Sequence, residues 1–422
     1  MQAKNACAHS ASRRRHRTAL QSPAHAAPPR PSQKLASSAP PRAKRNTDAW
    51  IAWNRSICLS AFDLMAQFYP LSVTKVRRET RDSVVVTLVP KDEHKQLFDF
   101  IQGQYLTFRT TIDGEDVRRT YSICSAVQDH TLRVGIKKVA GGRFSTWANS
   151  ELKAGQVLDV MPPLGHFYVP LDQAHRKHYV AFAGGSGITP VFAILKTTLL
   201  AEPHSLFTLF YANEAASTIM FREELEDLKN EFMGRLNLVH ILNREHQEVE
   251  LFNGLVTTEK CALLFKHWLD LKSVDTAFIC GPQPMMMTLN AALRAHGLSQ
   301  QQIKIELFAT PKMLKRKPRI DLAETAAPPE TCNATIIIEG RARTFAMQKK
   351  TETILEAAMR EGLEPPHACK SGVCSTCRAK LVEGEVDMDQ NFALEDYEIA
   401  RGYILTCQSY PVSDNVIVNY DH

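Results

Sequence analysis

Long apolar runs are missing from this sequence. No stretch of about 18 consecutive apolar residues occurs, which is the length that a membrane-spanning helix requires. The apolar segment of a secretory signal is missing as well. We therefore expect a cytoplasmic protein without a membrane span, whose thiols stay reduced and form no disulfides.

Basic charge is scarce outside the first 64 residues. The formal net charge is +6, but residues 1–64 hold eleven Lys and Arg against two acids, and residues 65–422 carry a net −3. The larger part of the chain thus lacks the overall basic character of nucleic-acid binding. We expect no nucleic-acid partner.

Large apolar side chains are sparse in residues 1–64, which are rich in Arg, Ser, Ala and Pro. Such a composition cannot bury enough surface to fold, so a disordered basic extension is predicted. The composition is typical of an organelle transit peptide, or of an extension upstream of a start at Met65. We favour the second interpretation.

The rest of the chain shows three kinds of patterning and no internal repeat. Residues 65–172 contain short runs rich in Val, Thr and aromatics between turns, which predicts an antiparallel β-barrel. Residues 173–308 alternate apolar strands with amphipathic helices, as in a parallel α/β sheet. Residues 309–331 form a charged, proline-containing linker, and residues 332–422 combine a hairpin, a helix and further strands. The predicted fold class is multidomain: β, α/β and α+β.

Four cysteines near the C-terminus follow the spacing C-x4-C-x2-C and then C after 29 residues. They are Cys369, Cys374, Cys377 and Cys407. This is the spacing of plant-type [2Fe–2S] ligation. Gly372 and small neighbours would let backbone N–H groups approach the inorganic sulfides.

Other chemistries for these thiols fit less well. Structural zinc normally uses two C-x2-C pairs, and the chain has one. A redox dithiol would leave Cys369 and Cys407 without a role, and a disulfide framework needs an oxidising compartment. The spacing therefore favours a [2Fe–2S] cluster. Scattered thiols are predicted to be buried or incidental: Cys7, Cys58, Cys124, Cys261 and Cys332.

Two patterns in the predicted barrel suit a flavin. Arg119, Tyr121 and Ser122 form R-x-Y-S, in which a guanidinium can bind phosphate and a phenol ring can pack on an isoalloxazine. Further on, AGGRFSTWA predicts a glycine turn that opens a helix, where residues 142–145 could hold a pyrophosphate. An ordinary strand with a surface arginine and a plain serine-capped turn are the alternatives.

The stretch AFAGGSGITPVFAIL places glycines between an apolar strand and a helix, where dinucleotides bind in α/β sheets. Gly185, Gly187 and Pro190 give G-x-G-x-x-P, so the G-x-G-x-x-G fingerprint is absent. Cys280 and Gly281, in FICGPQPMM, follow another strand, where a small residue leaves room for a nicotinamide ring. A buried strand-end thiol is the alternative for Cys280.

Taken in order, these motifs resemble the ferredoxin–NADP reductase superfamily. With the C-terminal cysteine pattern, the chain resembles the reductase components of multicomponent oxygenases over residues 67–422. FYPLSVTKVRRET, RRTYSICS, GGRFSTWAN and YAN…MFREELEDLK are similar to the reductase subunits of phenylacetyl-CoA epoxidases. The resemblance implies a flavin-binding barrel, an NAD(P)-binding domain and a β-grasp ferredoxin domain.

The same resemblance implies an oxidoreductase that passes electrons from NAD(P)H through FAD and a [2Fe–2S] cluster to a terminal oxygenase, with phenylacetyl-CoA epoxidase as the expected acceptor. Another ring-modifying oxygenase, a haem monooxygenase, a desaturase or a hybrid-cluster protein are alternative acceptors. A zinc-organised interaction protein is an alternative of another class. It predicts a colourless preparation, whereas the reductase predicts a brown-yellow one.

The resemblance also implies roles for individual residues. Arg119, Tyr121 and Ser122 would contact the flavin, and a pyrophosphate on the glycine turn favours FAD over FMN. Glu306 and Phe308 match the family's E-x-F motif beside the flavin ring. The flavin pyrophosphate is assigned to Gly142, Arg143, Phe144 and Ser145. The nicotinamide nucleotide is assigned to Gly184, Gly185, Gly187, Thr189, Cys280 and Gly281.

Two acidic features bear on partners. Glu214 stands where relatives often have an arginine that grips a 2′-phosphate, so an NADH preference is the hypothesis, although Arg222 nearby could compensate. The acid-rich residues 383–398 lie beside the cysteine pattern. They could dock a basic partner or form a solvated face, and we expect the solvated face.

Overall fold

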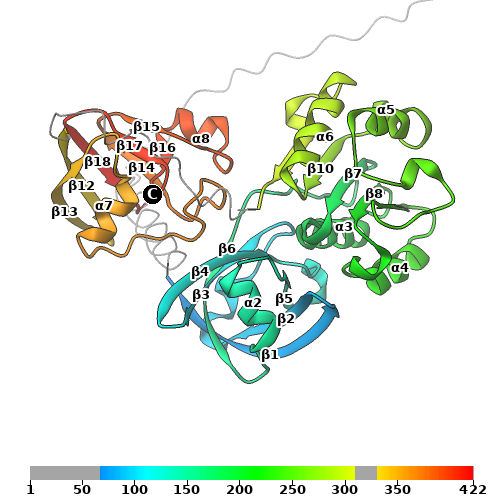
Figure 1. Cartoon of the computed structure of the whole chain (residues 1–422), viewed down its shortest axis with the longest axis horizontal. Helices are drawn as coiled ribbons and strands as arrows, with labels where there is room; N and C mark the ends of the chain where they lie inside the picture. The colour runs from blue at the N-terminus through cyan, green and yellow to red at the C-terminus, as the bar shows by residue number, and fades with distance from the viewer. Residues whose placement is uncertain (1–66, 309–329, 422) are drawn as a thin grey trace, which may run out of the picture. The chain divides into compact units, whose positions relative to one another are not determined.

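The computed structural model describes residues 67–308 and 330–421. The predicted N-terminal extension and nearly all of the predicted linker lie outside these residues. The described chain forms three large sheets and one two-stranded sheet (Figure 1). None of its helices is long and apolar enough to cross a membrane.

The first sheet is antiparallel, with the strand order β4-β3-β6-β1-β2-β5. Its strands are β1 Tyr69–Thr80, β2 Ser83–Pro90, β3 Tyr105–Ile112, β4 Glu115–Ser122, β5 Leu132–Lys137 and β6 Val157–Leu164. A bridge between Ile123, just after β4, and Val134 on β5 joins the two edges, so the sheet curls into a barrel. Its inward side chains form one apolar core that also packs helix α2, Arg143–Ser150. Short 3₁₀ helices are η1 Asp92–Phe98 and η2 Val127–Asp129.

The second sheet is parallel, with the order β11-β10-β7-β8-β9. The strands are β7 His178–Gly184, β8 Leu206–Asn213, β9 Leu236–Leu242, β10 Thr276–Cys280 and β11 Ile303–Glu306. The helices are α3 Ile188–Ala201, α4 Arg222–Glu231, α5 Thr258–His267 and α6 Gln283–Ala295. Helices α3 and α4 cover one face and α5 and α6 the other (Figure 1). The central strands β7, β8 and β10 are buried on both faces, which is why their sequences read as continuous apolar runs. Connecting 3₁₀ helices are η3 Gly185–Gly187, η4 Ala216–Thr218, η5 Glu250–Phe252, η6 Leu271–Ser273 and η7 Gln300–Gln302.

Two helices beside this sheet differ from the sequence prediction. The stretch TIMFREELEDLKNEF predicts a helix from residue 218, but α4 begins at Arg222. Phe221, at the helix N-cap, has left-handed backbone angles of φ 58° and ψ 28°, which a helix cannot continue through. Helix α5 was not predicted from the sequence.

The third sheet is mixed, with the order β13-β12-β18-β14-β16. Its strands are β12 Thr331–Ile338, β13 Arg341–Gln348, β14 Arg378–Glu383, β16 Tyr403–Leu405 and β18 Asn415–Asn419, and β15 Val386–Met388 pairs with β17 Ser409–Pro411. Strands β12 and β18 are parallel and the other pairs antiparallel. Helix α7, Ile354–Arg360, starts with a capping box between Thr353 and Glu356 and packs on this sheet, and α8 is Asp396–Ala400.

Candidate active site

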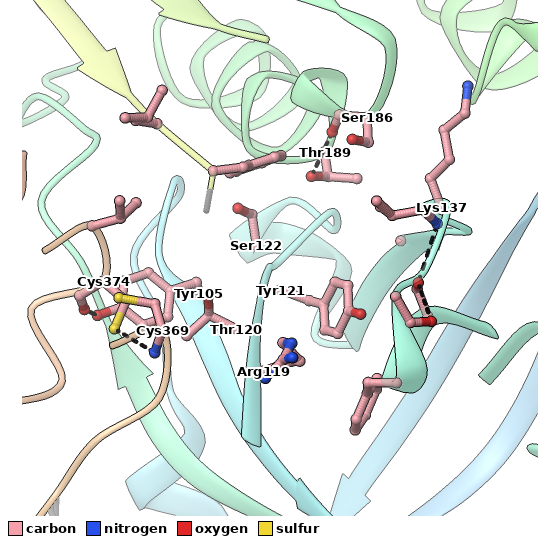
Figure 2. Close-up of a pocket in the computed structure, with 18 of the residues that line it drawn as sticks. Tyr105, Arg119, Thr120, Tyr121, Ser122, Lys137, Ser186, Thr189, Cys369 and Cys374 are labelled. Atoms are coloured by element: carbon pink, nitrogen blue, oxygen red, sulfur yellow. Dashed lines mark hydrogen bonds between the residues drawn. The ribbon is translucent and has the colours of Figure 1, made fainter. Parts of the chain in front are cut away.

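One pocket gathers residues from the barrel, the parallel sheet and the cysteine loop (Figure 2). The barrel contributes Tyr105, Arg119, Thr120, Tyr121, Ser122, Gly135, Lys137, Val139, Gly141, Gly142, Phe144 and Ser145. The parallel-sheet unit contributes Ser186, Thr189, Glu306, Leu307 and Phe308, and the cysteine loop Cys369, Val373 and Cys374. Three sequence segments that are far apart in the chain therefore meet at one cavity.

Strand β4 presents the R-x-Y-S residues to this pocket. Figure 2 shows Tyr121 and Thr120 pointing to opposite sides of the strand, as the alternation of a β-strand requires. The ring of Tyr121 lies 5.4 Å from that of Phe144 at the start of α2. Burial raises the pKa of the Tyr121 phenol, so it stays neutral as an apolar wall with a polar tip.

The glycine turn before α2 lines the pocket next to that wall. Ser145 Oγ accepts a hydrogen bond from Val139 N at 3.1 Å and donates to Gly142 O at 3.2 Å, which fixes the turn. Arg143, in contrast, points to the β3–β4 hairpin, where it pairs with Glu115 and donates to Ile112 O at 2.9 Å. Arg143 is not among the pocket-lining residues, so its side chain adds nothing to the predicted pyrophosphate site, which depends on backbone N–H groups of the turn.

The end of the parallel sheet brings a carboxyl group to the pocket. Glu306 Oε2 accepts a hydrogen bond from Ser122 Oγ at 3.0 Å, although the two residues come from different sheets. Enclosure by protein atoms raises the pKa of Glu306 to about 8, and the Ser122 hydrogen bond opposes this rise only in part. The carboxyl is therefore protonated at neutral pH and can hold a proton at the pocket wall.

The predicted nucleotide residues converge at the carboxyl ends of β7 and β10. A Cβ on Gly187 would lie 2.1 Å from Cys280 O, and one on Gly281 would lie 2.9 Å from Gly184 N. The absence of side chains thus lets the two strand ends touch through their backbones. Gly185 has a φ of 52°, and burial raises the pKa of the Cys280 thiol. Of this loop, Ser186 and Thr189 line the pocket.

Glu214, just after β8, lies outside this pocket. Its carboxylate is 3.4 Å from Arg244 Nη1, and both side chains are exposed. Arg244 belongs to none of the motifs read from the sequence, and its cation partly balances the carboxylate. The repulsion of a 2′-phosphate by Glu214 is therefore weaker than the sequence alone suggests.

The four cysteines of the C-terminal pattern are buried close together. Among residues 67–308 and 330–421, no three His, Cys, Asp or Glu side chains are arranged to hold a single ion. The thiols form two pairs: a hydrogen bond with Cys374 lowers the pKa of Cys369 to about 5, and one with Cys377 lowers the pKa of Cys407. Two thiolates on each of two irons is what a [2Fe–2S] cluster needs, so the donor set fits.

The loop around the first pair is tightly wound. Lys370, Gly372 and Ser375 all have positive φ angles, and Ser371 N donates to Cys369 Sγ at 3.4 Å. A Cβ on Gly372 would lie 2.6 Å from Gln390 O, so this glycine is required by packing as well as by its φ. None of the eight cysteines within the described residues forms a disulfide.

Strand β3 connects this loop to the pocket. Tyr105 pairs across the strands with Ser122, and its hydroxyl donates to Cys374 O. Arg118 lies 3.2 Å from His367 Nδ1. Tyr105 and Leu164 pack with the loop residues Ala368, Cys369, Val373 and Cys374. Figure 2 shows Cys369 and Cys374 beside Tyr105 and Thr120. The first thiol pair therefore opens onto the same cavity as Tyr121 and Ser122.

Several lining residues carry no sequence signal. Tyr105, Gly135 and Lys137 reach the pocket only because β3 and β5 neighbour the two sides of β4.

Cys377 and Cys407 lie on the far side of the loop, in a small apolar cluster with Leu394 and Leu405. An aromatic wall, a strand-to-helix loop of the parallel sheet and the first thiol pair thus lie around one pocket. This combination suits an oxidoreductase that uses a flavin, an iron–sulfur cluster and a nicotinamide nucleotide.

Comparison with known proteins agrees. Residues 70–168 match the oxidoreductase FAD-binding domain, residues 182–290 the oxidoreductase NAD-binding domain, and residues 336–412 the 2Fe–2S iron–sulfur cluster binding domain. The predicted cofactors FAD, NAD(P)H and [2Fe–2S] are thereby confirmed. The zinc-organised alternative loses its basis.

Full-length relatives specify the family. The chain is 40% identical over 360 residues to a subunit of 1,2-phenylacetyl-CoA epoxidase from Escherichia coli K12, covering 85% of this chain and 99% of the relative. It is 32% identical to the ferredoxin reductase component of 3-ketosteroid-9-alpha-monooxygenase from Rhodococcus rhodochrous, covering 83% and 96%. Phthalate dioxygenase reductase has the same fold, with a TM-score of 0.51, 23% identity and coverage of 83% and 98%. The chain belongs to the family of oxygenase reductase components with FAD-, NAD- and 2Fe–2S-binding domains.

Proposed function

We propose that this reductase delivers electrons to the oxygenase of a phenylacetyl-CoA epoxidase. The observation that carries the proposal is the 40% identity to one subunit of that enzyme, over 99% of the length of the relative. The stretches FYPLSVTKVRRET and RRTYSICS are the sequence motifs that support it. The reduced thiols that the cluster needs are consistent with work in the cytoplasm.

The residues around the pocket have separable tasks in this proposal. Bound FAD and a bound cluster supply the conversion of a two-electron donor into single-electron transfers. Tyr121 and Phe144 form the wall against which the flavin is held, and the turn at 142–145 offers backbone N–H groups to its pyrophosphate. Ser122 and Glu306 hold a proton between the two sheets.

The remaining residues would bind the nicotinamide nucleotide and the iron–sulfur cluster. The backbone contact between Gly184 and Gly281 and the loop at 185–189 offer a site for the nucleotide beside the flavin wall. Cys369 and Cys374, which line the pocket, would hold one iron of the cluster, and Cys377 and Cys407 would hold the other. We also propose that the flavin-binding unit begins at residue 65, the nucleotide-binding unit at 173, the linker at 309 and the ferredoxin unit at 332.

Reconstitution tests the acceptor. The purified chain is mixed with the oxygenase component of phenylacetyl-CoA epoxidase, phenylacetyl-CoA and NADH or NADPH, and epoxide formation is followed by mass spectrometry. We expect turnover that requires the chain. Reduction of ferricyanide without any epoxide, together with turnover of a 3-ketosteroid 9α-monooxygenase oxygenase, would assign it to another oxygenase.

A further inference from the structure

Glu79, near the end of β1, is a buried carboxylate that reaches from the barrel to the nucleotide-binding unit. Its side chain is 6% exposed, and Oε1 accepts a hydrogen bond from Phe221 N at 2.6 Å. Oε2 lies 2.7 Å from Arg77 Nη2 as an ion pair and makes no hydrogen bond within the described chain. Arg77 also bonds Glu224 on α4 at 2.7 Å. Glu79 and Phe221 lie in FYPLSVTKVRRET and MFREELEDLK, two stretches that carry the family resemblance, but the sequence motifs assign neither residue to the flavin or nucleotide site.

The group that Glu79 binds is a strained one. Phe221 has left-handed backbone angles, which are unfavourable for a bulky side chain. It is 1% exposed, and its ring stacks on Phe192 of α3 at 4.9 Å between centroids. A buried N–H needs an acceptor, and the barrel provides it through Glu79. The carboxylate therefore stabilises the turn at 220–221 with which α4 begins.

The same turn is linked to the glycine loop of the nucleotide site. Met220 N donates to the Tyr211 hydroxyl at 3.2 Å, and that hydroxyl donates to Gly185 O at 3.0 Å. Tyr211 is fully buried, so no water competes for these bonds. One hydroxyl thus ties the turn to the loop at 184–187.

Close packing couples the barrel to both segments. A Cβ on Gly135 of β5 would lie 2.7 Å from Thr189 Cγ2, 3.1 Å from Met220 Cε and 3.4 Å from Phe221 Cζ. Thr189 lines the pocket that Tyr121 also lines. A displacement of the turn would therefore move the loop relative to the flavin wall.

We propose that Glu79 is a positioning residue for reduction of the flavin by the nicotinamide nucleotide. By accepting the Phe221 N–H it fixes the turn at 220–221, and through Tyr211 it fixes the glycine loop against the pocket. The inference rests on the reductase family and is independent of which oxygenase receives the electrons.

Three variants of the full chain, loaded with FAD and cluster, test this. Glu79→Ala removes the acceptor, Glu79→Gln keeps a neutral acceptor, and Glu93→Ala changes an exposed barrel glutamate. Anaerobic stopped-flow absorbance follows the bleaching of the flavin and the long-wavelength charge-transfer band of a nucleotide stacked on the flavin. The nucleotide used is NADH or NADPH, whichever reduces the wild-type flavin faster. We expect Glu79→Ala to bleach about tenfold more slowly with a weakened band. Glu79→Gln and Glu93→Ala should remain close to wild type.

Flavin content and Tm separate positioning from folding, because a positioning defect leaves both near wild type. If the Glu79→Ala variant does not retain FAD, the Tyr211→Phe variant is measured in its place. That variant breaks the link to Gly185 without touching the barrel, and slow bleaching is again expected. The proposal is overturned if Glu79→Ala bleaches at the wild-type rate and shows the wild-type charge-transfer band. If Glu79→Ala does not hold FAD, the same result in Tyr211→Phe overturns it. A Glu79→Gln variant as slow as Glu79→Ala overturns the hydrogen-bond account as well.

Discussion

Ser122 and Glu306 share a hydrogen bond at the meeting point of the barrel and the parallel sheet. Each residue alone is ordinary: a strand-end serine and a strand-end glutamate. Together, and enclosed by protein atoms, they keep a carboxyl group protonated at neutral pH beside the flavin wall. A neutral acid there avoids a negative charge next to a group that must accept electrons.

Glu306→Gln is expected to remove a pH-dependent step. Burial raises the pKa of Glu306 from 4.5 to about 8. The contribution of the protonated carboxyl to the stability of the folded protein is therefore complete below pH 4.5 and is lost as the pH rises through 8. The same ionisation changes the charge of the pocket. Above pH 8 the ionised form should slow flavin reduction in the wild type. Stopped-flow rates between pH 6 and about 9.5 should show a decline centred near 8, which the variant lacks. A wild-type decline that persists in Glu306→Gln would contradict this assignment.

Glu214→Ala is expected to narrow the preference for NADH over NADPH. Loss of the carboxylate leaves Arg244, which can attract a 2′-phosphate. Both groups are exposed, so the electrostatic effect is at most about 1 kcal/mol, or about fivefold in kcat/KM. Ferricyanide reduction with both nucleotides measures it, and Glu245→Ala is the neighbouring control. A wild type that prefers NADPH would refute the NADH hypothesis.

At the scale of elements, strand β3 and the cysteine loop form the junction between the flavin pocket and the cluster. Tyr105 and Thr107 face the loop from β3, and Cys374 and Thr376 face them. The Cys369–Cys374 pair is thereby held at the pocket, while the Cys377–Cys407 pair lies in its own apolar cluster. The two ends of the cluster site thus have different surroundings.

Cys374→Ser should separate the two halves of the electron path. Reduction of the flavin by NAD(P)H needs no cluster ligand, so ferricyanide reduction should stay within about twofold of wild type. Reduction of cytochrome c through the cluster should fall by more than about tenfold, since loss of a ligand destabilises the site. Cys332→Ser, a buried thiol on β12, is the matched control and should keep both activities. Equal loss of both activities at normal flavin content would contradict the division.

Tyr105→Phe should weaken the junction while leaving flavin reduction intact. It removes the hydroxyl that bonds Cys374 O, a contact of about 1 kcal/mol, so electron transfer from flavin to cluster should slow about fivefold. Anaerobic stopped-flow at flavin and cluster wavelengths resolves the two phases. Tyr69→Phe, in the barrel core, is the control. An unchanged second phase would show that the hydroxyl has no part in docking.

At the scale of the whole molecule, the three large sheets belong to the three cofactor-binding domains. The barrel and the mixed sheet each have an apolar core of their own, whereas the core on the α3–α4 face of the parallel sheet also takes in Val85 of β2 and Cys124 just after β4. Function arises where the three domains meet, since the pocket draws side chains from all three. This arrangement suits a protein that must hold a nucleotide, a flavin and a cluster in sequence.

Removal of residues 1–64 should leave the reductase intact. The described residues start at 67, and the three matched domains lie within residues 70–412. A chain that starts at Met65 should bind FAD and cluster with the absorbance spectrum, Tm and ferricyanide activity of the full chain. A fall in Tm of more than about 4 °C would show that the segment contributes to folding.

Local patterns along the chain are enough to predict the cofactors and most of the architecture. Cysteine spacing, a glycine-rich strand-to-helix turn and R-x-Y-S are such patterns, and the chemistry of thiolates, backbone N–H groups and guanidinium follows from local order. Strand periodicity likewise predicted the antiparallel and parallel sheets. These features can be predicted because they depend mostly on residues that are close together in the chain.

Long-range packing selects the residues that share the pocket. Tyr105, Gly135 and Lys137 enter through strand pairing, and Ser122 meets Glu306 across 184 residues of sequence. The pKa of Glu306, the pairing of Glu214 with Arg244 and the turn of Arg143 toward Glu115 depend on such contacts. The left-handed Phe221 is held by Glu79 from another sheet, and no local preference predicts it. The burial of a side chain and the identity of the residue that it contacts are set by tertiary packing. No short stretch of sequence determines that packing.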